Sequence, residues 1–201
     1  MSDSKQQFAD PTALGLFGLA MVTLVASSQK LGITEGLSYV LPWVIFLGAC
    51  VQVVAGVLDF KKGNAFGGTA FCAYGFFWFS MGMSWMMNMG VLGETLQAAI
   101  DPKQLAFAFI GYLVVSIFFT IGATKTNKVL FWDFVFICFL FIGLAVSTFV
   151  SEGPIHTGFH YFAAISELII AILSFWGCGA NIVNTICGRS VIPIGKAFGK
   201  L

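Results

Sequence analysis

Gln52 is the first polar side chain that could bind a solute, because it interrupts an uncharged apolar stretch that covers residues 36–58. Gly48 and Gly56 lie four residues to either side of it, so the three residues share one face of a helix. Because glycine has no side chain, a neighbouring helix or a solute can approach the Gln52 amide, which offers both donors and an acceptor. Two interpretations follow: a binding site for a carboxylate or a neutral polar solute, or a packing seam in which Gln52 joins two helices.

The next polar group is the segment at residues 63–69, which reads GNAFGGT. A helix that begins there would direct free N–H groups and the positive end of its dipole towards an anion. Asn64 fits equally well as a helix cap in a plain interfacial turn. Further along, large apolar side chains recur at intervals of three or four residues, at Tyr74, Trp78, Met81 and Trp85. This helical spacing is typical of core packing. Tyr74 stands apart, because its hydroxyl group needs a hydrogen-bond partner far from the membrane interface.

Two acidic residues lie in or near apolar segments, where polar groups are costly and often functional. Glu167 shares a helix face with His160, seven residues earlier. A carboxyl group in a membrane without a basic partner tends to stay neutral, which suits proton coupling. If the last helix starts late, Glu167 instead lies near the outer headgroups. Asp133 is expected to be a surface acid close to Lys128.

The sequence contains no recognisable motif for catalysis, metal binding or disulfide formation. There is no HExxH motif, no Ser-His-Asp arrangement and no phosphate-binding loop, so we do not expect an enzyme. The five cysteines lack metal-ligand spacing, and their odd number argues against a disulfide framework. We interpret them as small buried side chains and expect neither a metal site nor a cofactor.

The elements that must position these residues follow from composition. Of the 201 residues, 58% are hydrophobic and 9% are charged, whereas soluble domains carry about 25% charged residues. A membrane-spanning helix uses about 20 mostly apolar residues, so the chain suits about six spans with short connections. This composition excludes a soluble enzyme and a disordered chain, and the net charge of +1 argues against a nucleic-acid binder. The apolar runs are too continuous for a transmembrane barrel, so we predict an all-α integral membrane protein.

Uncharged stretches of sufficient length predict six transmembrane helices separated by helix-breaking residues. Their expected ranges are 12–29, 38–60, 66–90, 104–124, 129–150 and 160–184. Residues 1–11 are the expected N-terminal segment, residues 12–186 the six-helix domain and residues 187–201 the C-terminal tail. The first ten residues, MSDSKQQFAD, have neither the basic start nor the apolar core of a signal peptide, so the first helix is expected to remain as a span.

Lysine and arginine residues are unevenly distributed between the two sides of the predicted bundle. One side holds only Lys30 and Lys103. The other side holds eight basic residues: Lys5, Lys61, Lys62, Lys125, Lys128, Arg189, Lys196 and Lys200. The positive-inside rule places the second side, and with it both termini, in the cytoplasm.

Several motifs resemble those of the acetate uptake transporter family, and together they span nearly the whole chain. Residues 10–16 read DPTALGL and are similar to the family's NPAPLGL signature, with matches at Pro11, Leu14, Gly15 and Leu16. Residues 61–78, which begin KKGNAFG and include Tyr74, Gly75 and Trp78, resemble the motif around its third helix. Residues 188–195, GRSVIPIG, are similar to its C-terminal signature.

The resemblance implies a six-helix protomer in a homohexamer, with one pore per protomer for acetate and related short carboxylates such as succinate. An apolar constriction of Phe, Leu and Tyr is typical of the family and falls by position on Leu19, Ile137 and Tyr74. The other residues expected to line the pore are Gln52, Asn64 and Thr69. Glu167 remains the candidate for proton coupling, although relatives tend to carry a small residue there.

The expected function is movement of acetate across the cytoplasmic membrane together with a proton. A channel for small neutral solutes such as urea or ammonia is the alternative, because it would use the same apolar constriction with Gln52 and Asn64. A membrane scaffold whose glycines serve only assembly is the third interpretation.

Overall fold

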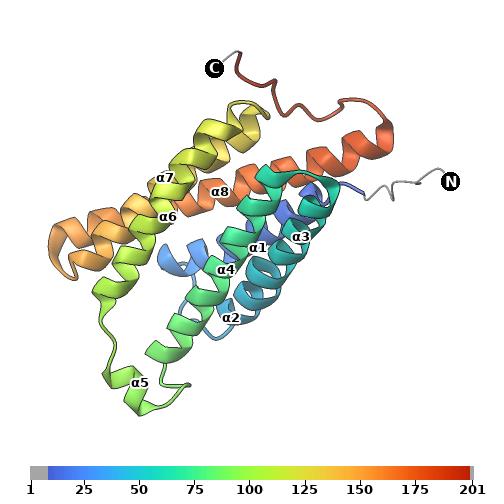
Figure 1. Ribbon diagram of the computed structural model, residues 1–201. Helices are drawn as coiled ribbons and strands as arrows, with labels where there is room; N and C mark the ends of the chain where they lie inside the picture. Colours follow the sequence, from blue (N-terminus) through green and yellow to red (C-terminus); the bar gives the residue numbers. More distant parts are fainter. Residues whose placement is uncertain (1–8, 200–201) are drawn as a thin grey trace.

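The computed structural model describes residues 9–199, and in this range every regular element is a helix (Figure 1). The helices are α1 (Thr12–Lys30), α2 (Val40–Trp43), the π-helix η1 (Val44–Val51), α3 (Gln52–Lys62), α4 (Ala65–Asn88), α5 (Glu94–Ala98), α6 (Pro102–Ala123), α7 (Lys128–Phe149) and α8 (Gly153–Cys187). Since α2, η1 and α3 follow one another without a break, they form one span, Val40–Lys62. The prediction of an all-α chain is confirmed for the described residues.

Five helical stretches among the described residues are long and apolar enough to cross a membrane: α1, Val40–Lys62, α6, α7 and α8. α4 has 24 residues and no charged side chain. It is not one of these five, because its glycine, serine and tryptophan residues make it less apolar. A helix of that length is nonetheless about 36 Å long, enough to cross a hydrocarbon core. The five spans identify a multi-pass membrane protein.

Local sequence explains where several helices begin and end. Asn64, Asp101 and Asn127 cap α4, α6 and α7, because each side chain accepts a hydrogen bond from a backbone N–H group two or three residues further on. α3 ends at Gly63, whose φ of 88° lies in the left-handed region that favours glycine. The interpretation of Asn64 as a helix cap is therefore confirmed.

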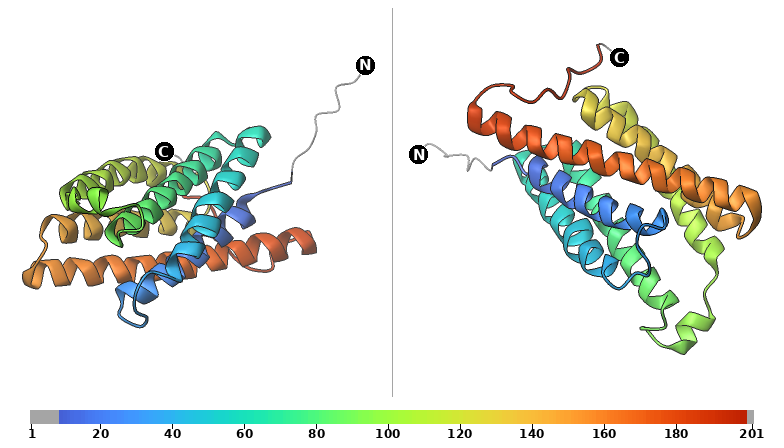
Figure 2. Two further views of the ribbon diagram at one scale, coloured as in Figure 1. Left: turned by 90° about the horizontal axis from the view of Figure 1, so that it is seen from below. Right: turned by 180° about the vertical axis from the view of Figure 1, so that it is seen from behind.

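The long helices run in alternating directions, and the pairs α1–α8, α3–α4, α6–α7 and α7–α8 make the most extensive contacts. α8 passes along α1 over one part of its length and along α7 over another (Figure 2). Both described chain ends lie at the end of the bundle that carries the α3–α4 and α6–α7 turns (Figure 1). We call it the lysine-rich end, because it holds Lys61, Lys62, Lys125, Lys128, Arg189 and Lys196. Lys5 and Lys200 of the predicted basic set lie outside the described residues.

The shared face of Gly48, Gln52 and Gly56 is where the second span packs against α4. A methyl group at Gly48 would overlap the ring of Trp78, and one at Gly56 would overlap Cys72. The packing interpretation is therefore confirmed for the two glycines. Their close contacts hold Gln52 in a fixed position inside the bundle, where the side chain is fully buried.

The residues of α4 that share helical spacing, Tyr74, Trp78, Met81 and Trp85, pack into the core, as their spacing predicts. Tyr74, Trp78 and Met81 are buried, and Trp85 packs against the same cluster. The Tyr74 hydroxyl oxygen lies 2.8 Å from Oγ of Ser116 on α6. Because Ser116 itself donates to the Tyr112 carbonyl at 2.6 Å, Tyr74 is the donor of this pair. The hydroxyl thus has the partner that the sequence requires.

Most predicted helix boundaries agree with the structure within a few residues, but the last helix does not. α8 begins at Gly153 rather than at residue 160, so the alternative in which this helix starts late is wrong. Pro154 does not prevent the earlier start, because proline in a first helical turn lacks only an N–H group that would have no partner there. Glu167 consequently lies about four turns inside α8. The short helix α5 has no counterpart among the predicted ranges.

Candidate functional site

A cavity of about 310 Å³, the large cavity, lies between α1, α3, α4, α7 and α8. Its lining extends from Tyr74 and Ile137 in the core to Asp10 and Ile194 at the lysine-rich end. The residues singled out by the sequence that meet here are Leu16, Leu19, Gln52, Asn64, Tyr74 and Ile137. Within the described part of the chain, the lining contains no lysine, arginine or histidine, although many basic residues lie close to this end.

Three polar side chains in the cavity wall carry acceptor atoms without a hydrogen-bond partner of good geometry, although the side chain of Asn64 approaches the Asp59 carboxylate. Among the described residues, four buried side-chain atoms lack a hydrogen-bond partner, and all four belong to this wall: Oε1 of Gln52, both carboxyl oxygens of Asp59 and Oδ1 of Asp133. A buried polar atom without a partner costs about 1–3 kcal/mol. Their concentration around one cavity indicates a wall built to accept hydrogen bonds from a solute or from water.

Gln52 is held by its own helix. Its Nε2 donates a hydrogen bond to the backbone carbonyl of Gly48 at 2.8 Å. That contact fixes the amide plane and leaves Oε1 as the free acceptor. The flanking glycines pack against α4 while Gln52 lines the cavity without joining two helices, so its role in binding a solute stays a prediction.

Asp59 lies two turns beyond Gln52 on the second span and is fully buried. Its carboxylate lies against Gly67 in the first turn of α4, where a Cβ atom would overlap Oδ2 of Asp59 and Nδ2 of Asn64. Gly67 donates its N–H to Oδ1 of Asn64 at 3.1 Å. The N-terminus of α4, where the sequence predicts room for an anion, thus faces the protein's own carboxylate. Glycine at position 67 makes this close approach feasible.

Asp59 is not among the residues predicted from the sequence, because it stands at the end of an apolar run and close to two lysines. One signal was present: Asp59 follows Gln52 by seven residues, so the two share a helix face. The same spacing relates Glu167 to His160. Seven-residue spacing therefore indicates a shared face but does not say whether that face lines a cavity.

The expectation that Asp133 is a surface acid is wrong, because its side chain is 1% exposed. Oδ2 of Asp133 accepts a hydrogen bond from Oγ of Ser174 on α8 at 2.9 Å. Lys128, the residue expected beside it, is exposed and lies over the ring of Phe198 instead. Helix packing causes the difference, since α7 turns this face towards α8 and the cavity rather than outwards.

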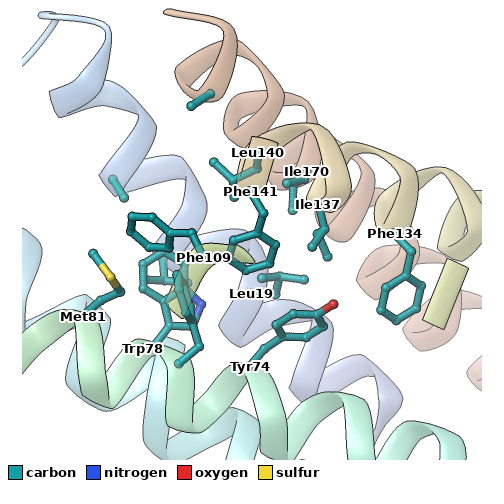
Figure 3. Close-up of a cluster of buried hydrophobic side chains, with 14 of the residues drawn as sticks. Leu19, Tyr74, Trp78, Met81, Phe109, Phe134, Ile137, Leu140, Phe141 and Ile170 are labelled. Carbon is teal, nitrogen blue, oxygen red and sulfur yellow. The ribbon is translucent and has the colours of Figure 1, made fainter. Parts of the chain in front are cut away.

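Leu19, Tyr74 and Ile137, which the family resemblance assigns to a constriction, approach one another from α1, α4 and α7 (Figure 3). All three line the large cavity, and all three also line a second, much smaller cavity of about 10 Å³. The other walls of this small cavity are apolar apart from Thr23. The three side chains therefore lie between two cavities, and we call them the neck.

Asp10 lies at the opposite end of the large cavity from the neck. Its Oδ2 pairs with Nζ of Lys62 at 2.8 Å, and its Oδ1 accepts hydrogen bonds from Oγ1 and the backbone N–H of Thr12 at 2.6 and 2.9 Å. Partial burial alone would raise the pKa of the Asp10 carboxyl, but the bonds from Lys62 and Thr12 outweigh it and hold this pKa below its ordinary value. Asp10 therefore remains ionised beside the cavity at neutral pH.

Two predicted site residues lie away from the large cavity. Thr69 is exposed on α4 and does not line either cavity. Glu167 is 1% exposed but lines neither cavity, and its Oε2 forms an ion pair with Nζ of Lys30 at 2.8 Å. The premise that this carboxyl has no basic partner is therefore wrong. Lys30 lies just beyond the predicted range of the first helix, yet it ends α1 and its side chain is only 13% exposed.

The predicted signature residues of α1 serve different parts of the structure. Pro11 occupies the N-cap position of α1. Leu16 lines the large cavity, and Gly15 is packed against the ring of Phe71. Leu14 faces outwards, with 40% of its side chain exposed.

Comparisons with known proteins agree with this architecture. The chain is 31% identical over 192 residues to the succinate-acetate/proton symporter SatP of Escherichia coli K12, covering 95% of this chain and 97% of that protein. It is 28% identical to the ammonia transport outward protein 2 of Saccharomyces cerevisiae, covering 89% of this chain and 63% of the yeast protein. A solved structure of the bacterial acetate channel SatP matches with a TM-score of 0.84 and 30% identity, covering 94% of this chain and all of that one.

The family model described as the GPR1/FUN34/yaaH family matches residues 1–195, nearly the full length of the chain. This match and the similarity to the bacterial acetate transporter confirm the resemblance that the sequence motifs indicate. The chain is therefore a multi-pass membrane protein that belongs to the GPR1/FUN34/yaaH family.

Proposed function

We propose that this protein carries acetate, and by the same route other short carboxylates such as succinate, across a membrane together with a proton. The observation that carries the proposal is the large cavity, which has unpaired polar atoms in its wall and ends at the apolar neck. Relatives that are named for acetate transport support the substrate class. The protein acts in this proposal as a transporter and not as an enzyme.

The neck sets the barrier to ions. Leu19 and Ile137 offer no polar atom, and the hydroxyl of Tyr74 is engaged with Ser116. Such an apolar constriction loses its water and blocks hydrated ions, whereas a neutral or partly dehydrated acid passes. A solute must also leave again, so binding has to be weak and shared between several sites. In this proposal, Gln52 and Asn64 provide such sites in the large cavity.

We further propose six spans, with α4 as the sixth, and both termini in the cytoplasm of a cytoplasmic membrane. The lysine-rich end and the positive-inside rule support this orientation. Cys187 provides a test, because it is exposed at the lysine-rich end. A membrane-impermeant maleimide should label Cys187 only after the cells are opened. Tyr39→Cys in a Cys187→Ser background is the matched control, since Tyr39 is 87% exposed at the other end and should react in intact cells.

The proposed assembly is a homohexamer, as the family resemblance implies, with one cavity in each protomer. Large apolar side chains such as Phe46, Phe107 and Phe118 are at least 65% exposed on the isolated chain. In a membrane, such surfaces face lipid or a second copy of the chain. Native mass spectrometry of the detergent-solubilised protein measures the number of chains directly.

The decisive test is uptake of radiolabelled acetate into proteoliposomes, with and without an imposed pH gradient. A coupled transporter accumulates acetate above equilibrium only when the external side is acidic. Gradient-independent flux that stops at equilibrium would instead identify a channel. No flux under either condition would contradict the transport proposal, and empty liposomes measure the background from acetic acid that crosses the lipid.

A second candidate is passage of ammonia or urea, and one observation favours it. All four unpaired atoms in the cavity wall are acceptors when the carboxyl groups are ionised, and such a wall suits solutes that bring N–H donors. Relatives named for ammonia transport agree with this chemistry. Competition separates the two candidates, because excess ammonium or urea should inhibit acetate uptake only if they share the cavity. Uptake of labelled urea or methylammonium without acetate uptake would favour the second candidate.

A further inference from the structure

Asp133 is an acid beside the neck, on the same helix as one of its three residues. It precedes Ile137 by four residues on α7, so the two side chains lie one turn apart on one helix face. Both residues line the large cavity, and only Ile137 also lines the small one. A solute that leaves the neck towards the lysine-rich end therefore meets Asp133 within one helical turn.

The two carboxyl oxygens of Asp133 have different surroundings. Oδ2 is fixed by the hydroxyl of Ser174, which donates to it at 2.9 Å. Oδ1 is buried and has no partner in the protein. A proton on this carboxyl is therefore best placed on Oδ1, where it does not compete with the Ser174 hydrogen bond. From Oδ1 it would be donated to a solute in the cavity.

The charges around Asp133 make a proton necessary for an anion to bind. The titratable groups that line the same cavity are Asp59 from the second span, Asp10 before α1 and Tyr74 from α4. α8 contributes Ser174, which is neutral, and Lys128 on α7 points to Phe198. Among the described lining residues no cation is present to offset the acids. An acetate anion beside an ionised Asp133 would face a like charge. The oxygens of both carboxylates only accept hydrogen bonds, so neither group could donate one to the other.

We propose that Asp133 is the proton-exchange residue of this pathway, an inference that rests on the proposed transport of acetate. Acetic acid that has passed the neck gives its proton to the Asp133 carboxylate, so that its O–H bond breaks as a new O–H bond forms on Oδ1. The neutral carboxyl then donates a hydrogen bond to the acetate, which leaves towards the lysine-rich end. Asp133 returns its proton to cavity water, and one acetate and one proton have moved together. Efflux runs through the same steps in reverse.

Of the residues that the structure describes, two more acids are buried, and neither meets the same conditions. Glu167 lies outside both cavities, and Lys30 already provides its counter-charge. Asp59 lines the large cavity but not the small one, and it lies two turns from Gln52 towards the lysine-rich end. Its carboxylate lies against Gly67 in the first turn of α4. Glu167, which lines neither cavity, therefore provides the comparison variant for the test.

The test compares Asp133→Asn with the wild type in proteoliposomes. The Asn side-chain oxygen still accepts from Ser174, and its NH₂ group supplies a permanent donor that cannot exchange a proton. We expect the variant to retain exchange of external labelled acetate for internal acetate, because exchange needs no net proton movement. Its proton-driven accumulation and its acetate-dependent change of internal pH should both become slower, because acetic acid that has passed the neck must then give its proton directly to water. Glu167→Gln should keep proton-driven accumulation, because Glu167 lines neither cavity.

Each other outcome contradicts the proposal. Accumulation by Asp133→Asn at the wild-type rate would overturn it, and so would loss of proton-driven accumulation in Glu167→Gln. A variant that fails to fold is recognised by its gel-filtration profile. In that case Asp133→Glu is compared with Asp133→Gln, and only Asp133→Glu should keep the wild-type rate of proton-driven accumulation. Infrared spectroscopy gives an independent readout: a protonated-carboxyl band that responds to acetate should be absent from Asp133→Asn. If the wild type moves no acetate at all, the transport proposal itself fails.

Discussion

Lys30 at the end of α1 and Glu167 in the middle of α8 form an ion pair, with Nζ of the lysine 2.8 Å from Oε2 of the glutamate. Glu167 is almost fully buried. The backbone of Lys30 makes a separate contact with α8, because its carbonyl accepts a hydrogen bond from Nε2 of His160 at 2.9 Å. The same residue of α1 is therefore attached to α8 through its side chain and through its backbone. Because α8 also carries Ser174 and packs along α1 and α7, these contacts hold the three helices in register around the large cavity.

Lys30→Met should destabilise the protein more than Glu167→Gln does. The first change leaves a buried carboxylate without its partner, at a cost of about 3 kcal/mol in the free energy of unfolding. The second leaves the lysine, which can extend its flexible side chain to water. Thermal unfolding in detergent measures both. Lys103→Met is the matched control, because Lys103 is exposed at the same end of the bundle.

The Lys30→Met/Glu167→Leu double variant tests whether the pair acts as a unit. Replacing both charges by apolar groups of similar size is often close to neutral. The double variant should therefore unfold at a higher temperature than Lys30→Met alone. Equal destabilisation by the single and double variants would show that Lys30 acts through its other contacts, such as the one with Trp85.

Leu19→Phe should reduce the rate of acetate uptake by narrowing the neck. The added ring enters the space between Tyr74 and Ile137, so we expect larger carboxylates such as butyrate to lose more rate than acetate. Initial uptake rates of the two substrates in proteoliposomes check this. Leu14→Phe on the same helix is the control, because Leu14 faces outwards and the same change there should leave both rates unaffected. Equal effects at both positions would exclude the neck as the selective element.

The sequence was sufficient for the architecture and for much of the cavity wall. Hydropathy and charge placed most helices within a few residues of their bounds, since these depend on local composition. Gln52 and Asn64 were identified because their side chains interrupt apolar or glycine-rich segments. Tyr74, Leu19 and Ile137 were identified through the family resemblance. The cavity brings all five together.

The interhelical contacts of the acids could not be predicted in the same way. The spacing of residues defines which side chains share a face, but not which face turns towards which neighbour. The nearby start of its helix predicts a surface acid at Asp133, yet packing against α8 buries it beside Ser174. The charge of Lys30 ends the predicted range of the first helix, yet Lys30 belongs to α1 and pairs with a residue 137 positions away. Such pairs depend on tertiary packing, which a single sequence does not encode locally.

Gln52→Leu should separate function from stability at the cavity wall. Leucine fills a similar volume and removes an unpaired acceptor, but it also removes the bond to the Gly48 carbonyl. These effects are each about 1 kcal/mol and opposite in sign, so the free energy of unfolding should change by less than about 1 kcal/mol. Acetate uptake should fall, with a higher apparent KM. Unchanged uptake together with a lower unfolding temperature would assign Gln52 to packing alone.

Asp10→Asn should show how much the ion pair with Lys62 contributes to the free energy of unfolding, and at which pH it does so. The pKa of Asp10 is lowered in the folded protein, so its contribution to stability is present above the unfolded-state value of about 3.9 and is lost as the pH falls through the folded-state value. The carboxylate is half exposed, and its pair contributes less than about 1 kcal/mol. Wild type and variant should therefore differ slightly at pH 7 and converge below pH 4, as seen by thermal unfolding across this range. A difference in unfolding temperature that grows as the pH falls would contradict this pH dependence.

Gly15→Ala should destabilise the start of the bundle and disturb the large cavity. A Cβ atom at Gly15 would overlap the ring of Phe71, and Phe71 lines the cavity, so the ring must move into it or α1 must shift. Overpacking of this kind costs about 1–3 kcal/mol. Gly111→Ala on α6 is the matched control, because nothing lies within 4 Å of its Cβ position and alanine is favoured over glycine inside a helix by up to about 1 kcal/mol. Thermal unfolding should thus move in opposite directions for the two variants, and acetate uptake should fall only for Gly15→Ala. Parallel changes would mean that α1 can shift at this position without cost to the cavity.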